Sequence, residues 1–210
     1  MKLKVCGLTQ PENINDLLSL PIDLMGFIFY KPSPRYISDV IDFDYMRSIP
    51  KQINKVGVFV NEPTYSILNA VAHYDLDIVQ LHGSESANQC AELKPYINII
   101  KAFSVDDNFD FSITEAYQNV VDYFLFDTKT QNYGGSGKQF NWQVLSRYKL
   151  NKPFFLSGGI NENSVTDILN LNHPQLYGID INSQFEVKPG IKDKNKINTF
   201  INHLQHENKL

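Results

Sequence analysis

Residues 121–127, VDYFLFD, form a short apolar run that ends in an aspartate. Successive side chains of a strand point to opposite faces, so Phe124 and Phe126 share one face. Leu125 and Asp127 share the other face. A run that is apolar on both faces is typical of a strand in a parallel sheet covered by helices. The run therefore predicts a buried strand, and if the phenylalanines face the helices, Asp127 points to the opposite side at the carboxyl end.

Seven further runs of this kind lie along the chain, at residues 3–6, 24–29, 55–60, 78–82, 97–103, 153–157 and 176–181. Stretches with helical spacing and a start signal lie between most of them, at residues 13–20, 63–73, 86–93, 141–148, 161–169 and 194–204. The segments 38–49 and 109–119 show helical spacing less clearly. Successive runs begin roughly 25 residues apart, which suits one strand and one crossover helix per unit. Eight such units favour a closed α/β barrel, the TIM (β/α)8 fold of eight parallel strands, over an open sheet.

The composition limits the class of protein. The chain has 210 residues, of which 42% are hydrophobic, and a formal net charge of −4. This length, without a Pro/Ser-rich linker, predicts one catalytic domain over residues 1–210. The acidic balance, without a run of five Lys or Arg, argues against nucleic acid or an anionic membrane surface as the main partner. No apolar run reaches the ~18 residues of a membrane span, and the first residues lack the pattern of a secretory signal. We therefore expect a cytoplasmic protein that binds a small molecule.

Polar residues close several of the runs, and the active site of a barrel is built from the carboxyl ends of its strands. The alternation that applies to Asp127 also places Cys6 and Asp180 on the inward face. We therefore expect Cys6 and Asp127 to face each other across one cavity. The full set at strand ends is Cys6, Gln80, His82, Asp127, Ser157, Gly158, Gly159, Asp180, Asn182 and Ser183.

Structural explanations compete with these interpretations. Cys6 can serve as a small buried apolar residue, Asp127 can cap the following loop, and His82 can be a hydrogen-bonded structural histidine. Cys90 lies inside an expected helix and is interpreted as a packing residue without a chemical role. Neither cysteine has a second Cys or a His cluster nearby, so we expect two free thiols, no disulfide and no metal site.

Two glycine-rich segments are candidates for phosphate sites. LSGGINENS, from residue 156, follows a strand and is expected to open a helix, which would offer backbone N–H groups to an anion together with Asn182 and Ser183. The alternative is that these glycines only make a tight turn. QNYGGSGKQFNW, 131–142, departs from the P-loop pattern at both ends, so a nucleotide-hydrolysing site is not expected. The stretch 128–140 is interpreted instead as a mobile cover over the barrel mouth. Arg35 follows the second run and is a candidate clamp for a carboxylate.

Taken together, the motifs resemble the phosphoribosylanthranilate isomerase family, single (β/α)8 barrels of tryptophan biosynthesis. A Cys-Gly after the first strand, an Asp after the sixth, and the glycine-rich and Pro-Gly-Ile-Lys-Asp segments form a specific combination that runs the length of the chain. The matching motifs are KVCGLT (4–9), SPRYIS (33–38), VGVFVN (56–61), QLHG (80–83), LFDT (125–128), GGSGKQFNW (134–142), LSGGI (156–160), GIDINSQFE (178–186) and PGIKD (189–193).

The resemblance implies a reaction and its residues. The reaction is a cofactor-free Amadori rearrangement of N-(5-phosphoribosyl)anthranilate to 1-(2-carboxyphenylamino)-1-deoxyribulose 5-phosphate. Cys6 is implied as general base and Asp127 as general acid, with Arg35 on the anthranilate carboxylate. The implied phosphate contacts are Gly158, Gly159, Asn182 and Ser183, and His82 and Asp180 are further candidate substrate contacts. A monomer or a homodimer is expected.

The sequence departs from the family pattern near the implied phosphate site, where Asn182 replaces a serine and Gln184 a glycine. Asparagine can still donate to a phosphate, but the lost glycine alters the backbone at this turn. The alternative functions are another sugar-phosphate barrel enzyme, such as an epimerase or indole-glycerol phosphate synthase, and a catalytically silent barrel that binds a phosphorylated ligand. A redox-regulated protein with Cys6 as its switch is a third.

Overall fold

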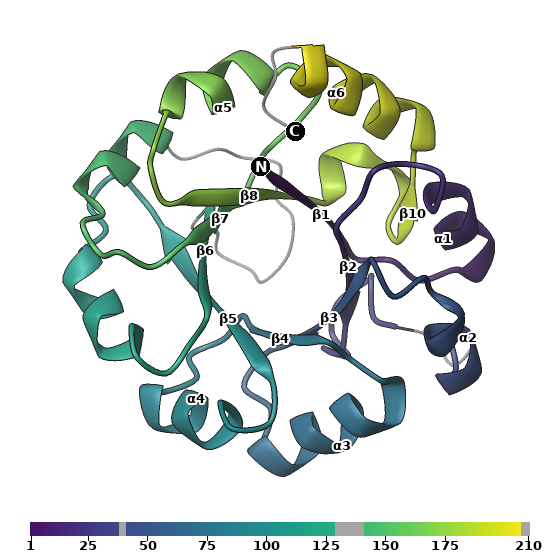
Figure 1. Ribbon diagram of the computed structural model, residues 1–210, viewed down its shortest axis with the longest axis horizontal. Helices are drawn as coiled ribbons and strands as arrows, with labels where there is room; N and C mark the ends of the chain where they lie inside the picture. The colour runs from purple at the N-terminus through teal and green to yellow at the C-terminus, as the bar shows by residue number, and fades with distance from the viewer. Residues whose placement is uncertain (38–40, 129–140, 207–210) are drawn as a thin grey trace.

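The computed structural model describes residues 1–37, 41–128 and 141–206, and its centre is a closed barrel of eight parallel strands. Figure 1 looks along this barrel and shows the strands as an inner ring with the helices outside it. Each strand pairs with its neighbour in the sequence, and β8 returns to pair with β1. The strands are β1 Lys2–Cys6, β2 Leu24–Ile28, β3 Asn54–Phe59, β4 Ile78–Leu81, β5 Asn98–Val105, β6 Tyr123–Thr128, β7 Phe154–Leu156 and β8 Leu176–Ile181. The predicted barrel is therefore confirmed.

Helices or 3₁₀ turns occupy the connections between the strands. The α-helices are α1 Pro11–Leu17, α2 Phe43–Ser48, α3 Thr64–Tyr74, α4 Ala87–Leu93, α5 Val165–Leu171 and α6 Lys194–His206. Phe111–Tyr117 (η1), Trp142–Arg147 (η2) and Ser183–Phe185 (η3) are 3₁₀ helices. After β8 the chain forms a small antiparallel hairpin from β9, Glu186–Lys188, and β10, Ile191–Lys192.

Several helix predictions differ from the structure in type or position. Segments 38–49 and 109–119, which had unclear spacing, contain α2 and η1. The expected helix at 141–148 is a 3₁₀ helix, although Asn141 caps it by accepting a hydrogen bond from the backbone of Gln143. So short a segment gains few helical hydrogen bonds, and its shape follows the packing of its buried side chains. The helix expected at 161–169 begins later, at Val165.

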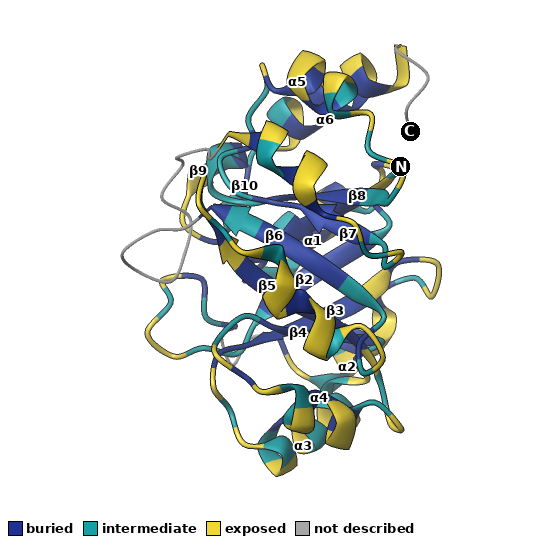
Figure 2. Cartoon of the chain, turned by 90° about the vertical axis from the view of Figure 1, so that its left-hand side faces the viewer, coloured by how far each residue is buried: buried dark blue, intermediate teal, exposed yellow. Residues whose placement is uncertain are grey.

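The apolar core has two layers, separated by the strands. Figure 2 shows that the barrel strands are largely buried, whereas the helices have exposed faces. The smaller layer fills the barrel interior with the inward-facing residues Leu24, Val56, Ile78, Ile100, Ala102, Leu125 and Phe155. The larger layer lies between the strands and the helices and includes Phe124 and Phe126. This separation confirms the alternation predicted for β6. Asp127 therefore lies on the inward face, above Leu125.

Both cysteines are free and buried, as expected. Within the described ranges, no helix combines the length and apolar character needed to cross a membrane.

Replacing Leu125 by alanine should destabilise the barrel by about 2–5 kcal/mol, because its side chain is fully buried in the interior layer and the surrounding strands can collapse only in part. Urea denaturation followed by circular dichroism measures this change. Ile113→Ala, at a side chain that is 47% exposed, is the control and should change stability by no more than about 0.5 kcal/mol. Equal losses for the two variants would contradict the two-layer core.

Candidate active site

A cavity opens at the carboxyl ends of the strands and encloses about 740 Å³, part of it open to solvent. The predicted site residues that line it come from β1, β4, β6, β7 and β8 or directly follow them. They are Cys6, His82, Asp127, Gly158, Gly159, Asp180, Asn182 and Ser183. Arg35 was predicted for the same site but does not line the cavity.

Cys6 is the last residue of β1 and is almost completely buried. A Cβ atom on the neighbouring Gly26 would lie 2.7 Å from Cys6 Sγ, so the glycine on β2 provides the space for the thiol. Burial raises the pKa of Cys6 above its ordinary value of 9.0, while the positive charges of Lys4 and Lys192 act in the opposite direction. The thiol is therefore mostly protonated at neutral pH. In its ionised form it is a correspondingly strong base.

Lys4 and Asp180 form a buried ion pair across the strands that close the barrel. Lys4 Nζ lies 2.8 Å from Asp180 Oδ1, and the two residues are directly paired between β1 and β8. Burial alone would lower the pKa of Lys4, but Asp180 and Cys6 raise it overall, so the ammonium group stays charged. Ser157 Oγ is 3.4 Å from the other oxygen of Asp180. Asp180 lines the cavity, as expected of a substrate contact, but its carboxylate is bonded to Lys4.

Asp127 is partly exposed in the cavity and is held by two neighbours. Nε2 of His82 lies 3.2 Å from Asp127 Oδ2, and the backbone N–H of Thr128 donates to Oδ1 at 2.8 Å. Nδ1 of His82 is 2.7 Å from Nε2 of Gln80. Because an amide NH₂ group only donates, this arrangement makes Nδ1 the acceptor and leaves the proton of a neutral imidazole on Nε2, facing Asp127. His82 is thus hydrogen-bonded, as the structural explanation held, but it also lies in the cavity beside the predicted acid.

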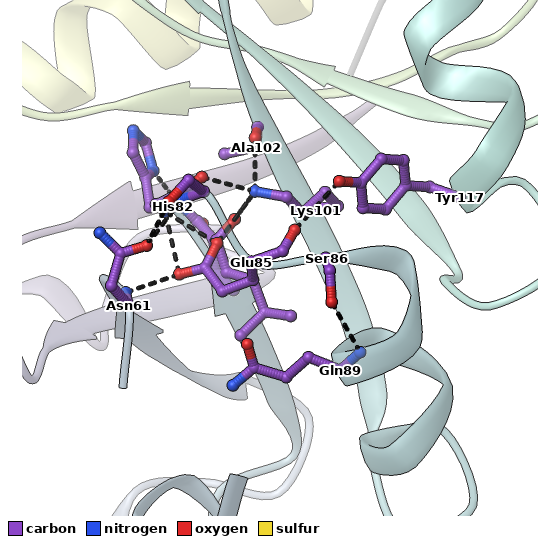
Figure 3. A network of polar contacts seen from close by, with 12 residues as sticks. Asn61, His82, Glu85, Ser86, Gln89, Lys101, Ala102 and Tyr117 are labelled. Atoms are coloured by element: carbon purple, nitrogen blue, oxygen red, sulfur yellow. Dashed lines mark hydrogen bonds and ion pairs between the residues drawn. The ribbon is translucent and has the colours of Figure 1, made fainter. Parts of the chain in front are cut away.

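A buried network that the sequence analysis missed fixes the turn that carries His82 (Figure 3). Lys101 Nζ donates to the carbonyls of Leu81 and Gly83, which flank His82, at 3.2 and 2.8 Å. It also pairs with Glu85 Oε2 at 2.9 Å, and Glu85 accepts hydrogen bonds from the backbone of Gly83. One feature of the sequence could have indicated this network. Lys101 lies inside the apolar run 97–103, and a buried ammonium requires a partner.

Arg35 is already paired with a carboxylate of this chain. Its Nε and Nη2 donate to Glu186 at 2.7–3.0 Å, and both side chains are largely buried. Lys192 Nζ also binds Glu186, at 2.7 Å, and contacts Asn182 Oδ1 at 2.6 Å. Glu186 and Lys192, on the β9–β10 hairpin, were absent from the predicted site. Arg35, the candidate clamp for a substrate carboxylate, is thus paired within the chain with Glu186.

The glycines after β7 adopt a conformation that other residues rarely take, with φ of +86° at Gly158 and +69° at Gly159. A Cβ atom at Gly158 would lie 2.7 Å from Asp127 Oδ1 and 2.2 Å from Thr128 Oγ1. Gly158 thus lets the turn after β7 pack against the end of β6. The segment 156–164 leads into α5, which begins at Val165 rather than at the expected residue 161. The proposed cover, 128–140, falls outside the described residues apart from Thr128.

Comparison with known proteins gives consistent results over the whole chain. Residues 3–203 match the family model of N-(5'phosphoribosyl)anthranilate (PRA) isomerase. A protein of this name from Parabacteroides distasonis is 44% identical over 98% of this chain and 94% of its own, and one from Phocaeicola vulgatus is 43% identical over 99% of each.

Solved structures agree with the sequence relatives. The phosphoribosyl anthranilate isomerase of Thermotoga maritima superposes with a TM-score of 0.88 at 34% identity, covering 98% of this chain and 99% of that one. A second isomerase structure, in complex with reduced 1-(o-carboxyphenylamino)-1-deoxyribulose 5-phosphate, gives a TM-score of 0.85 at 30% identity, with coverage of 98% and 99%. The chain therefore belongs to the phosphoribosylanthranilate isomerase family of enzymes.

Proposed function

We propose that this chain, acting as a single barrel domain, converts N-(5-phosphoribosyl)anthranilate to 1-(2-carboxyphenylamino)-1-deoxyribulose 5-phosphate by an Amadori rearrangement. The family serves tryptophan biosynthesis. The observation that carries the proposal is that a thiol, Cys6, and a carboxylic acid, Asp127, line one cavity. The isomerisation requires one acid and one base, and it needs no cofactor or metal.

Asp127 acts first, as the general acid. It donates a proton to the ribose ring oxygen, the C1–O bond breaks, and the anilino nitrogen supplies electrons to form a protonated Schiff base. The acid must carry a proton when the substrate binds, and the Nε2–H of His82 is placed to stabilise the carboxylate that forms when this proton is transferred. We propose that His82 contributes to substrate binding and holds Asp127 in position, and that the turn fixed by Lys101 keeps His82 in place.

Cys6 acts second, as the general base. The thiolate removes the proton on ribose C2, and the C–H electrons form a C1–C2 double bond while the iminium nitrogen becomes neutral. The resulting enolamine gains a proton at C1 and loses the C2 hydroxyl proton to give the ketose. Lys4 and Lys192 favour the thiolate electrostatically, which partly offsets the effect of burial on the Cys6 pKa.

The two anionic groups of the substrate, its phosphate and its anthranilate carboxylate, are assigned to different residues of the cavity region. We propose that the phosphate binds at Gly158 and Gly159 after β7 and at Asn182 and Ser183 after β8, the strands that often hold phosphate in such barrels. Arg35 remains the proposed partner of the anthranilate carboxylate, shared with Glu186. A guanidinium group has five N–H donors, so binding to one carboxylate leaves capacity for another.

The chemistry of the substrate indicates where in the cell the enzyme acts. A phosphorylated intermediate of amino-acid synthesis is charged and stays where it is made, so we propose a cytoplasmic enzyme. One solved structure from Thermotoga maritima is of monomers generated from a dimeric phosphoribosylanthranilate isomerase, and we propose that this chain functions as a monomer or a homodimer. Neither nucleic acid nor a membrane is a proposed partner.

Cys6→Ser and Asp127→Asn should each lower kcat by about 10²–10⁴-fold with a smaller change in KM, because each removes a proton-transferring group and keeps the shape of the side chain. The assay follows the fluorescence of phosphoribosylanthranilate generated from anthranilate and phosphoribosyl pyrophosphate. Cys90→Ala, at the buried thiol outside the cavity, is the control and should retain activity. Turnover near wild type in Cys6→Ser or Asp127→Asn would contradict the role assigned to that residue. If the wild type itself binds the ligand without turnover, the protein is a silent binding barrel.

Alkylation of Cys6 by iodoacetamide should accelerate from pH 7 to pH 9 without a plateau, because only the thiolate reacts and burial raises the pKa of Cys6 above 9.0. A raised pKa moves the midpoint of thiolate formation to higher pH, so the reactive fraction is still growing at pH 9. The Cys90→Ala protein confines the reaction to Cys6, and mass spectrometry measures the rate. A plateau reached near pH 7 would show that the lysines outweigh burial.

A further inference from the structure

Asn182 is held in one amide orientation by a buried lysine. Lys192 Nζ lies 2.6 Å from Asn182 Oδ1, and Lys192 is only 2% exposed. An ammonium group has donors and no acceptor, so the amide atom that faces it must be the oxygen. The Nδ2 group of Asn182 consequently points away from Lys192. Among the residues that the structure describes, none accepts a hydrogen bond from it, and Asn182 lines the cavity.

Glu186 keeps the lysine in place. It accepts a hydrogen bond from Lys192 at 2.7 Å and also binds Arg35, so one carboxylate is shared by two cations. The backbone N–H of Gly190 adds a further contact to Glu186 at 3.1 Å. Burial lowers the pKa of Lys192 to about 8, so below that pH the group formed by Arg35, Glu186 and Lys192 carries one excess positive charge beside the cavity. Such a charge favours an anionic ligand.

The space for this arrangement comes from Gly7. A Cβ atom at Gly7 would lie 2.8 Å from both Asn182 Oδ1 and Arg35 Cδ. Gly7 has φ of +78° and directly follows Cys6, so the backbone after the thiol packs closely against the Asn182 amide. The amide is therefore confined by Lys192 on one side and by the β1 turn on another.

We infer that Lys192 is a positioning residue that orients the Asn182 amide so that its Nδ2–H donates to the phosphate group of the substrate. This inference rests on the proposed function and goes beyond it, because it assigns phosphate affinity to a buried lysine acting through the residue at position 182. It also explains what fixes the amide, which could otherwise turn either its oxygen or its nitrogen toward the ligand. A serine hydroxyl rotates to suit its ligand, whereas an amide must be fixed to present nitrogen rather than oxygen.

The test measures competitive inhibition by inorganic phosphate in a double-mutant cycle of Lys192→Met and Asn182→Ala. Each single variant should raise the inhibition constant for phosphate roughly tenfold. The inhibition constant of the double variant should exceed that of Asn182→Ala by much less than tenfold, because only the charge effect of Lys192 then remains to be lost. Lys192 also favours the Cys6 thiolate, so kcat should fall in Lys192→Met and in the double variant. The test therefore relies on the inhibition constant for phosphate and not on kcat. Lys188→Met, which removes an exposed charge from the same hairpin, is the matched control and should leave the inhibition constant unchanged.

Independent effects that multiply in the double variant would overturn the inference, because Lys192 would then act by charge alone. Asn182→Asp provides a second test if Lys192→Met fails to fold. A carboxylate at this position keeps the contact with Lys192 and removes the N–H donor, so phosphate inhibition should weaken at least tenfold in a folded protein. Unchanged inhibition in Asn182→Asp would equally overturn the inference. A wild type without turnover would instead refute the proposed function.

Discussion

The ion pair between Lys4 and Asp180 lies at the closure of the barrel, and the site is built around it. A barrel closes only when its last strand pairs with its first, and here those strands carry an ammonium and a carboxylate directly opposite each other. Both groups are buried, so removing either would leave an uncompensated charge in the interior. Cys6 lies two residues beyond Lys4, at the open end of β1. The closure therefore sets both the position of the thiol and the positive charge beside it.

A second feature of the site is that its reactive groups are held by residues from other strands. Asp127 on β6 contacts His82 after β4, and the turn at His82 is fixed by Lys101 on β5. Asn182 after β8 is fixed by Lys192 on the hairpin that follows. In each case a buried lysine fixes the position of a cavity residue, through the flanking backbone for His82 and through the side chain for Asn182. Positioned groups of this kind lower the cost of organising the reaction.

The sequence predicted the parts of the site that depend on strand alternation alone. The order of apolar runs predicted the barrel, and the period of two placed Cys6, Asp127 and Asp180 on its inward face. The pairing of Arg35 with Glu186 was not predicted, because it depends on how the β9–β10 hairpin folds back toward β2. That contact joins residues separated by 151 positions, and no local pattern encodes it. Lys192 and Glu186 were missed because their positions likewise depend on how this hairpin folds back onto the barrel.

The most direct measurement is a crystal structure of this protein with reduced 1-(o-carboxyphenylamino)-1-deoxyribulose 5-phosphate, the compound bound in a related isomerase. We expect its phosphate within about 3 Å of backbone N–H groups at Gly159 and Ser183 and of Asn182 Nδ2. We also expect the ribulose C1 and C2 atoms between Cys6 and Asp127. A phosphate bound elsewhere in the cavity, or a sugar chain out of reach of the Cys6 thiol, would contradict this expectation.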